Sequence, residues 1–291
     1  MAAWSVAVVL PAEAGKPVPV GVVPSDAPEL ARPVPRSDSL DAEQILEMAR
    51  RAVDLVGGMA AFVPDTARTV LLKPNIVKAD PPGSGVTTDP RLVRAVALLV
   101  HEVAPRARIL IAEGSGGWVS PALRDCTQVE VFPERLVDGF EVGGYRQVAR
   151  ELQGQGLDID CYDLNFGPIR TLQVPGGGLA RDEYDLPAPV LDADAWINLP
   201  VAKTHGSKIT CCMKNHFGLL PGTRYGWNKS EGTPGRPGGA AGLALPEGRG
   251  RLRGPRRVGR PRQLRDGRPA LDPARPTSRG PRLHRGRAFG P

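Results

Sequence analysis

Cysteine is scarce in this sequence, and its spacing excludes the common cysteine-based sites. The 291 residues include four cysteines, Cys126, Cys161, Cys211 and Cys212, and none of them forms a C-x-x-C pair. A zinc ribbon or a ferredoxin-type cluster therefore lacks its usual ligands. Cys211 and Cys212 are adjacent, so a disulfide between them would be strained. We expect reduced thiols and a reducing, cytoplasmic compartment.

Long apolar runs are also missing. No stretch approaches the roughly 18 apolar residues that a membrane-spanning helix needs. The N-terminal segment MAAWSVAVVLPAEAG has no basic region, and Pro11 interrupts its apolar run. It does not read as a signal peptide, so we expect a soluble chain with no membrane partner.

Two further absences divide the charge along the chain. Residues 232–291 contain no lysine and only three acidic residues, but they hold 15 arginines, 13 glycines and 10 prolines. The whole chain has a formal net charge of +7, whereas its first 231 residues carry 23 basic and 28 acidic residues, a balance of about −5. A body of that sign does not bind polyanions by bulk electrostatics, so nucleic acid is an expected partner only if the tail is genuine.

This change of composition predicts an α/β domain over residues 1–231 and a separate tail over residues 232–291. The tail has too little apolar surface to offset the entropy cost of ordering it. Two explanations compete: a disordered basic tail that binds RNA or DNA, and an out-of-frame translation of a GC-rich gene. We favour the second, because the break is sharp, lysine is absent and Phe289 is the only aromatic residue there.

The first 231 residues carry the pattern of an α/β fold with a mostly parallel sheet and helices on both faces. Continuous apolar runs predict buried strands at 69–72, 108–112 and 195–199, with further strands at 5–10, 158–164 and 169–174. Helical spacing predicts helices at 41–56 and 91–103, the second capped by Asp89 with Pro90 in its first turn. A weaker helix is expected over 133–152, an extended connection over 11–39, and a short helix capped by Thr210.

Polar residues follow three of the predicted buried strands. They are Lys73-Pro74-Asn75, Glu113-Gly114-Ser115 and Lys203-Thr204-His205. Because ligands of open parallel sheets bind at the carboxyl ends of the strands, we expect these three groups to converge at one rim.

A gap in acidic residues marks the most informative segment. Residues 195–230 contain no aspartate or glutamate, but they hold four lysines, Arg224 and two histidines. Lysines at a strand end and a helix start suit a phosphate or carboxylate ligand. The alternative is a solvated basic surface. We favour a small anionic ligand because apolar residues such as Ile209, Met213 and Phe217 are interleaved with the charges.

Each candidate residue also has a purely structural explanation. Lys73 is either an anion contact or an exposed strand end, and Asn75 either meets the ligand or caps a turn. Thr88 lies with Asp89 at a helix N-terminus that can face the ligand, although capping alone explains Asp89. Glu113 is either a general base or metal ligand, or a partner for Lys73 or Lys203. His205 and His216, eleven positions apart, are a weak metal pair. We assign ligand-binding roles to Lys73, Asn75, Thr88, Lys203, Thr204 and Asn215, catalytic roles to Glu113, His205 and Lys214, and no residue to a metal; the cofactor and the oligomeric state stay unknown.

Four blocks in order resemble the domain-of-unknown-function family 362 (DUF362). They are LLKPNIV (71–77), TTDPRLVRAV (87–96), ILIAEGSGG (109–117) and INLPVAKTHGSKITCCMKNHFGLLPG (197–222), within residues 69–228. The resemblance implies an α/β domain, often linked to iron–sulfur modules, but this chain has no cluster-binding cysteine run. The family pattern also continues with further strands that this chain does not show, which favours a frameshifted or inactive truncated product.

A more distant similarity is to nickel-pincer lactate racemases. Those proteins place a histidine before a lysine-bearing loop that ends in Pro-Gly, as His205, Lys214 and Pro221-Gly222 do here. The likeness implies that Lys214 holds a cofactor and that His205 acts in acid/base work or near the metal. Whether the chain is an enzyme is left open.

Overall fold

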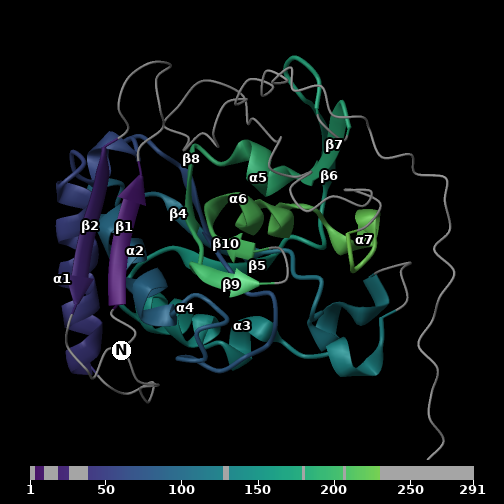
Figure 1. The fold of residues 1–291 in the computed structure, drawn as a ribbon, viewed down its shortest axis with the longest axis horizontal. Helices are drawn as coiled ribbons and strands as arrows, with labels where there is room; N and C mark the ends of the chain where they lie inside the picture. Colours follow the sequence, from purple (N-terminus) through teal and green to yellow (C-terminus); the bar gives the residue numbers. More distant parts are fainter. Residues whose placement is uncertain are drawn as a thin grey trace, which may run out of the picture. The chain divides into compact units, whose positions relative to one another are not determined.

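The computed structural model of the protein describes residues 4–9, 19–25, 39–126, 131–178, 181–205 and 208–229 (Figure 1). Its centre is a four-stranded, all-parallel sheet with the strand order β5-β4-β3-β8. The strands span Thr69–Pro74 (β3), Arg108–Glu113 (β4), Ile159–Asp163 (β5) and Ala195–Leu199 (β8). The prediction of an α/β fold around a parallel sheet is therefore confirmed.

Helices cover one face of this sheet. They are α1 (Ser39–Asp54), α2 (Pro90–Val103) and α4 (Tyr145–Gly154), and they share one buried cluster with Val70 and Leu72 of β3. The Asp89 carboxylate accepts a hydrogen bond from the Arg91 N–H, with Pro90 in the first turn, so the predicted cap of α2 is confirmed. The antiparallel β1–β2 hairpin (Trp4–Val9 and Val20–Ser25) contacts α1 (Figure 1).

The opposite face has a different cover. Leu71 of β3 and Trp196 of β8 point to this side, since side chains alternate along a strand. They pack with the antiparallel β6–β7 hairpin (Ile169–Gln173 and Glu183–Pro187) and with residues of the segment 215–225. Short elements complete this layer: α5 (Ala188–Asp192), α6 (Cys212–Asn215), η5 (His216–Leu219) and α7 (Gly222–Tyr225). The second face is thus covered by a hairpin together with short helices.

Several local predictions differ from the structure. The expected extended connection at 11–39 contains β2, and the weak helix at 133–152 is divided into η4 (Pro133–Arg135), α3 (Gly139–Val142) and α4. Gly144 has a left-handed φ of 85° at the break before α4, which explains why one continuous helix does not form there. The remaining short helices are η2 (Met59–Ala61) and η3 (Pro121–Cys126).

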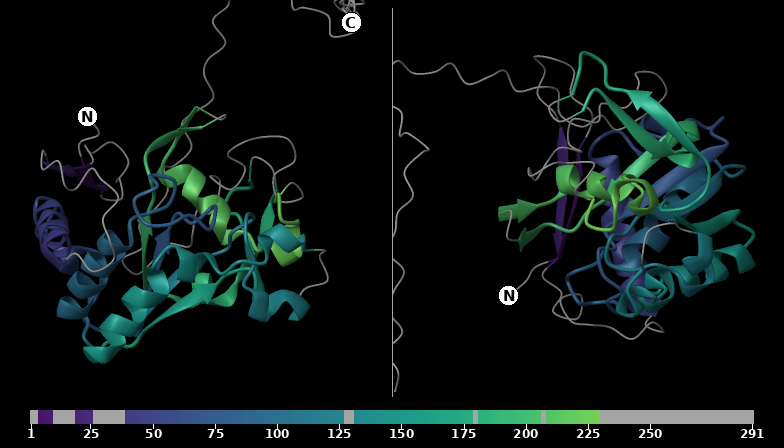
Figure 2. Two further views of the ribbon diagram at one scale, coloured as in Figure 1. Left: turned by 90° about the horizontal axis from the view of Figure 1, so that it is seen from below. Right: turned by 90° about the vertical axis from the view of Figure 1, so that its right-hand side faces the viewer.

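The segment after β8 is a hairpin, where the sequence predicted a strand-end loop and a capped helix. Lys203–His205 (β9) pairs antiparallel with Lys208–Thr210 (β10), and the hairpin projects from the rest of the fold in Figure 2. Thr210 therefore does not cap a helix: it ends β10, and its hydroxyl donates to the Lys203 carbonyl at 3.2 Å. The residue before α6 is Cys211, which makes no side-chain cap. Among the described residues, no helix has the length and apolar character to cross a membrane.

Candidate functional site

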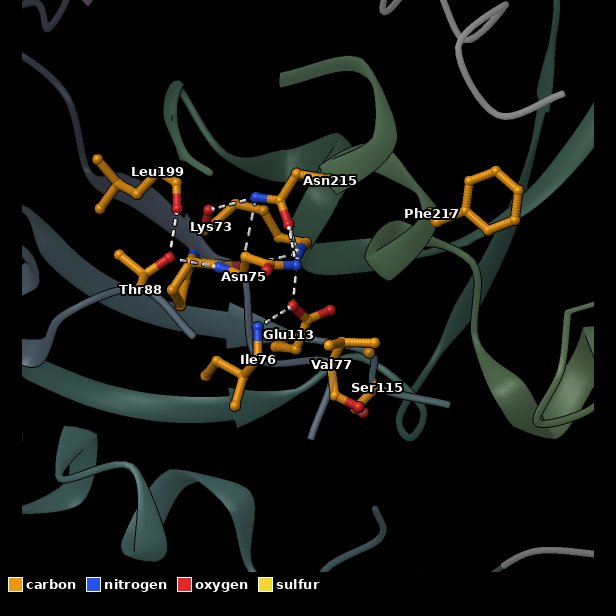
Figure 3. Close-up of polar contacts among 12 residues, drawn as sticks. Lys73, Asn75, Ile76, Val77, Thr88, Glu113, Ser115, Leu199, Asn215 and Phe217 are labelled. Carbon is orange, nitrogen blue, oxygen red and sulfur yellow. Dashed lines mark hydrogen bonds and ion pairs between the residues drawn. The ribbon is translucent and has the colours of Figure 1, made fainter. Parts of the chain in front are cut away.

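The carboxyl ends of β3 and β4 carry a buried ion pair. Lys73 is 0% exposed and Glu113 is 3% exposed, and the Lys73 ammonium donates to Glu113 Oε2 at 2.8 Å. The same oxygen accepts the Ile76 N–H at 3.0 Å, as Figure 3 shows. The two residues sit at the ends of neighbouring parallel strands, which is why the fold brings them together.

Burial sets the electrostatics of this pair. Desolvation lowers the pKa of Lys73 below its ordinary value, and the nearby Glu113 carboxylate acts in the opposite direction. The carbonyl of Pro74 accepts a second hydrogen bond from the Lys73 ammonium at 2.9 Å. Removing one member of such a pair leaves an uncompensated buried charge, so each residue depends on the other.

Asn215 connects this ion pair to the neighbouring strands. Its amide nitrogen donates to the Lys73 carbonyl at 3.0 Å and to Asn198 Oδ1 at 2.7 Å. Its Oδ1 accepts from the Asn75 amide at 3.2 Å and lies 3.4 Å from the Lys73 ammonium. The buried Asn215 side chain thus links the K-N segment of α6 to the ends of β3 and β8 (Figure 3).

A second chain of hydrogen bonds runs through Asn75 and Thr88. The Asn75 N–H donates to Thr88 Oγ1 at 2.8 Å, and this hydroxyl donates to the Leu199 carbonyl at 2.6 Å. Asn75 Oδ1 accepts from the Lys203 ammonium at 2.7 Å. The ends of β3 and β8, the start of α2 and the β9 strand therefore meet at one place, as expected from the strand ends in the sequence.

Among the described residues, Lys203 and Lys214 differ from Lys73 in having no carboxylate partner. Lys203 donates to Asn75 Oδ1 and to the Val86 carbonyl, and within the described part of the chain no acidic group pairs with either lysine. Desolvation lowers the pKa of both, and the charge of Lys214 lowers the pKa of Lys203 further, against weaker opposing effects of Asp80 and Glu113. The charge of Lys214 therefore disfavours the protonated form of Lys203.

The remaining predicted residues of the β9 strand contribute less that can be described. Thr204 is exposed on the hairpin and takes part in its ladder opposite Ile209. The side chain of His205 lies outside the described residues, so its catalytic role stays a prediction. His216 is buried, and its ring packs edge-on against Trp196 with centroids 5.3 Å apart. Burial, and secondarily the charge of Lys73, lowers the pKa of His216 to about 4.

Asp163 is a site residue that the sequence reasoning missed. It ends β5, directly beside Glu113 at the end of β4. Its Oδ1 accepts the Asn165 N–H at 2.9 Å, whereas its Oδ2 is enclosed and has no hydrogen-bond partner in the described structure. Burial raises the pKa of Asp163 to about 7, partly offset by its hydrogen bond with Asn165 and by the charge of Lys229. Its position at the end of a predicted strand was the available signal.

Lys229 is the second residue that was missed as part of the site. Its ammonium donates to three backbone carbonyls, those of Gly114, Phe217 and Leu220. The residue is buried and has a left-handed φ of 54°, which is uncommon for a residue with a side chain. Desolvation lowers the pKa of Lys229 to about 7. The contacts tie η5 and its following turn to the end of β4.

Two glycines allow η5 to approach the ion pair closely. A Cβ on Gly218 would lie 1.9 Å from Glu113 Oε1 and 2.5 Å from the Lys73 ammonium. A Cβ on Gly114 would lie 2.8 Å from the Gly218 carbonyl, which accepts the Gly114 N–H at 2.8 Å. Only glycine at 218 leaves room for the lysine and carboxylate beneath it.

Metal ligands do not gather in the described part of the chain. No group of three or more histidine, cysteine, aspartate or glutamate side chains there has the geometry to hold a metal ion. The expectation that no residue binds a metal stays a prediction, because the side chain of His205 lies outside the described residues.

Comparison with known proteins places these residues in a family. The profile described as "Domain of unknown function (DUF362)" matches residues 70–262, which extends past the predicted boundary at residue 231. The thylakoid-associated protein sll1697 of Synechocystis sp. (strain ATCC 27184 / PCC 6803 / Kazusa) is 32% identical over 193 residues, covering 66% of this chain. The match covers 51% of that relative, so the chain spans about half of its length. The resemblance seen in the four sequence blocks is thus confirmed, and the chain belongs to the DUF362 family.

Proposed function

We propose that the chain binds a small anion, a phosphate or a carboxylate, between Lys203 and Lys214 beside the carboxyl ends of the parallel sheet. The observation that supports this is the contrast among the lysines. Lys73 has its own carboxylate, whereas Lys203 is subject to the unfavourable charge of Lys214, and neither of these two lysines has an acidic partner in the described structure. An anion between them relieves this unfavourable effect and gains charge-assisted hydrogen bonds.

The other site residues have positioning roles in this proposal. Asn75 holds the Lys203 ammonium, and Asn215 connects Asn75 to the Lys73–Glu113 pair. The Thr88 hydroxyl holds Asn75 in place by accepting the Asn75 backbone N–H. The buried, charge-neutral ion pair therefore supports the anion-binding residues through Asn215 and Asn75. The proposal concerns binding, and the catalytic roles of Glu113, His205 and Lys214 remain predictions.

The experiment is calorimetric titration with inorganic phosphate and with acetate at low ionic strength. Replacing Lys203 or Lys214 with methionine keeps a long unbranched side chain and removes the charge. Each change is expected to weaken binding at least tenfold. Arg51→Gln is the matched control, because it removes an exposed positive charge from α1. Wild-type affinity in both lysine variants, or no binding by the wild-type protein, contradicts the proposal.

Compartment and redox partners are not part of this proposal. Thylakoid association is stated for the Synechocystis relative, of which the match covers about half. The cytoplasmic location and the link to iron–sulfur modules stay predictions, which cell fractionation and co-purification of the untagged chain would test.

A further inference from the structure

Cys211 and Cys212 form an accessible pair of thiols next to the proposed anion site. Their sulfur atoms are 3.8 Å apart, Cys211 is half-buried and Cys212 is exposed. A disulfide bond is about 2.05 Å long, so the two sulfurs need a local movement of less than about 2 Å to bond. Cys211 directly follows β10, and Cys212 is the first residue of α6, which also carries Lys214 and Asn215.

The backbone of this dipeptide supports the polar network described above. The Cys211 carbonyl accepts the Asn215 N–H at 3.1 Å, and the Cys212 carbonyl accepts from the Asn198 amide at 3.0 Å. Asn198 and Asn215 are themselves hydrogen-bonded at 2.7 Å. Any change in the peptide between the two cysteines therefore changes the support of Asn215, and with it the position of Lys214.

The two thiols also have the chemistry for exchange with a disulfide. Either thiol can donate in the hydrogen bond between the two sulfurs, and this bond lowers the pKa of Cys211 to about 6 and raises the pKa of Cys212. The thiolate is the attacking form in thiol–disulfide exchange, so the lowered pKa favours Cys211 as the attacking residue. Cys161 provides the contrast, because burial raises its pKa to about 12.

We propose that Cys211 and Cys212 are a thiol–disulfide exchange site that closes reversibly to a vicinal disulfide and thereby weakens the anion site. The oxidant is a low-molecular-weight disulfide. The Cys211 thiolate attacks one of its sulfurs, forming a mixed disulfide and releasing one thiolate. The Cys212 thiol then loses its proton and attacks Cys211 Sγ, which releases the second thiolate. The two cysteines together lose two electrons, and the small disulfide gains them and is reduced to two thiols.

The geometry explains why closure is reversible and why the site feels it. Adjacent Cα atoms across a trans peptide are about 3.8 Å apart, below the usual Cα separation of a disulfide, so the closed ring is strained. Strained, exposed disulfides are the easily reduced ones. Forming the ring rotates the peptide groups whose carbonyls hold Asn198 and Asn215. The exchange reaction stands on the cysteines alone, whereas its effect on anion affinity rests on the proposed function.

The test uses the full chain treated with oxidised glutathione and then with dithiothreitol. Peptide mass spectrometry is expected to find a disulfide within the Cys211–Cys212 peptide, with Cys161 still alkylatable, and dithiothreitol is expected to restore both thiols. Hydrogen exchange of the Asn215 backbone N–H should rise at least tenfold on oxidation. A persistent glutathione adduct without ring closure, or preferential oxidation of Cys161, overturns the exchange site.

Two variants separate this proposal from the anion site. Cys212→Ser is expected to trap glutathione on Cys211, and the double variant C211S/C212S is expected to resist oxidation and to keep its phosphate affinity in oxidised glutathione. In the wild-type protein that affinity should fall at least tenfold on oxidation and return on reduction. Ring closure with unchanged Asn215 exchange refutes the coupling. If reduced protein binds no phosphate, the anion site fails, while the mass and exchange measurements still decide the cysteine site.

Discussion

Four lysines near the carboxyl edge of the sheet illustrate how burial and partners decide what one residue type does. Lys73 is fully buried on a carboxylate, and Lys229 is buried on three carbonyls. Lys203 and Lys214 are only partly buried and have neither arrangement. A buried ammonium needs a full set of acceptors, whereas a partly exposed one can exchange water for a ligand. The first two lysines therefore stabilise the fold, and the other two are the candidates for binding.

Removing the Glu113 charge is expected to destabilise the protein strongly. In Glu113→Gln the Lys73 ammonium stays buried without its carboxylate, and we expect the free energy of unfolding to fall by about 3–5 kcal/mol. Urea denaturation followed by circular dichroism measures this loss. The double variant K73M/E113Q removes both charges and should be more stable than Glu113→Gln alone. A double variant that is less stable than the single one contradicts a stabilising ion pair.

Gly218→Ala tests the close approach of the η5 segment to the ion pair. The added Cβ would meet Glu113 Oε1 at 1.9 Å, so the segment must move, and we expect a loss of about 1–3 kcal/mol in unfolding free energy. Gly154→Ala is the matched control. Gly154 is exposed at the end of α4 with nothing within 4 Å of a Cβ, and alanine there should stabilise by about 0.4–1 kcal/mol. Equal effects of both changes would rule out the packing role of Gly218.

Asp163 predicts a pH dependence of stability. Its folded-state pKa of about 7 lies above the value of about 3.9 expected in the unfolded chain. Between these values the unfolded state has lost the proton that the folded state keeps. The contribution of Asp163 to the free energy of unfolding is therefore at its maximum below about pH 4 and falls as the pH rises to 7. An asparagine side chain does not titrate, and so the variant Asp163→Asn lacks this decline.

The measurement is the unfolding free energy of both proteins from pH 4 to pH 7. Wild type minus Asp163→Asn should fall by roughly 1–3 kcal/mol over this range. The contribution of His216, whose pKa of about 4 affects both proteins, largely cancels in the difference. A flat difference would show that Asp163 ionises normally in the folded protein.

At the scale of elements, the segment 211–229 covers the polar edge of the sheet and is fastened by Lys229. We predict that Lys229→Met leaves the carbonyls of Gly114, Phe217 and Leu220 without their donor and lowers stability by about 2–4 kcal/mol. Hydrogen exchange should rise in residues 214–220, while the strand β3 keeps its protection. Uniform loss of protection across the sheet would argue against a local fastening role.

The long elements could be predicted from the sequence, and the short ones could not. The runs 69–72, 108–112 and 195–199 are continuous apolar strands, and α2 has an Asp-Pro start, so hydrophobic pattern and capping decide them. The β9–β10 hairpin has three residues in each strand, too few for a period to be recognised. Strand-end convergence predicted that Lys73, Glu113 and Lys203 meet. Which lysine is neutralised depends on cross-strand distances that the sequence does not contain.

At the scale of the whole molecule, two boundaries are in competition. The change in composition predicts that the domain ends at residue 231, whereas the DUF362 match runs to residue 262. Within the described residues, which end at Lys229, the buried clusters extend to Tyr225 and Lys229 contacts the site. The boundary at residue 231 stays a prediction, since it rests on the change of composition.

A chain that ends at Glu231 decides between the two boundaries. We expect its unfolding free energy to lie within about 0.5 kcal/mol of that of the full chain, because no apolar pattern after residue 231 supplies core residues. A second chain that ends at Arg262 is the comparison. If the shorter chain is clearly less stable than the longer one, residues 232–262 are part of the domain. The removed residues carry 15 arginines, so nucleic-acid binding that depends steeply on salt should be confined to the full chain if the tail is a functional one.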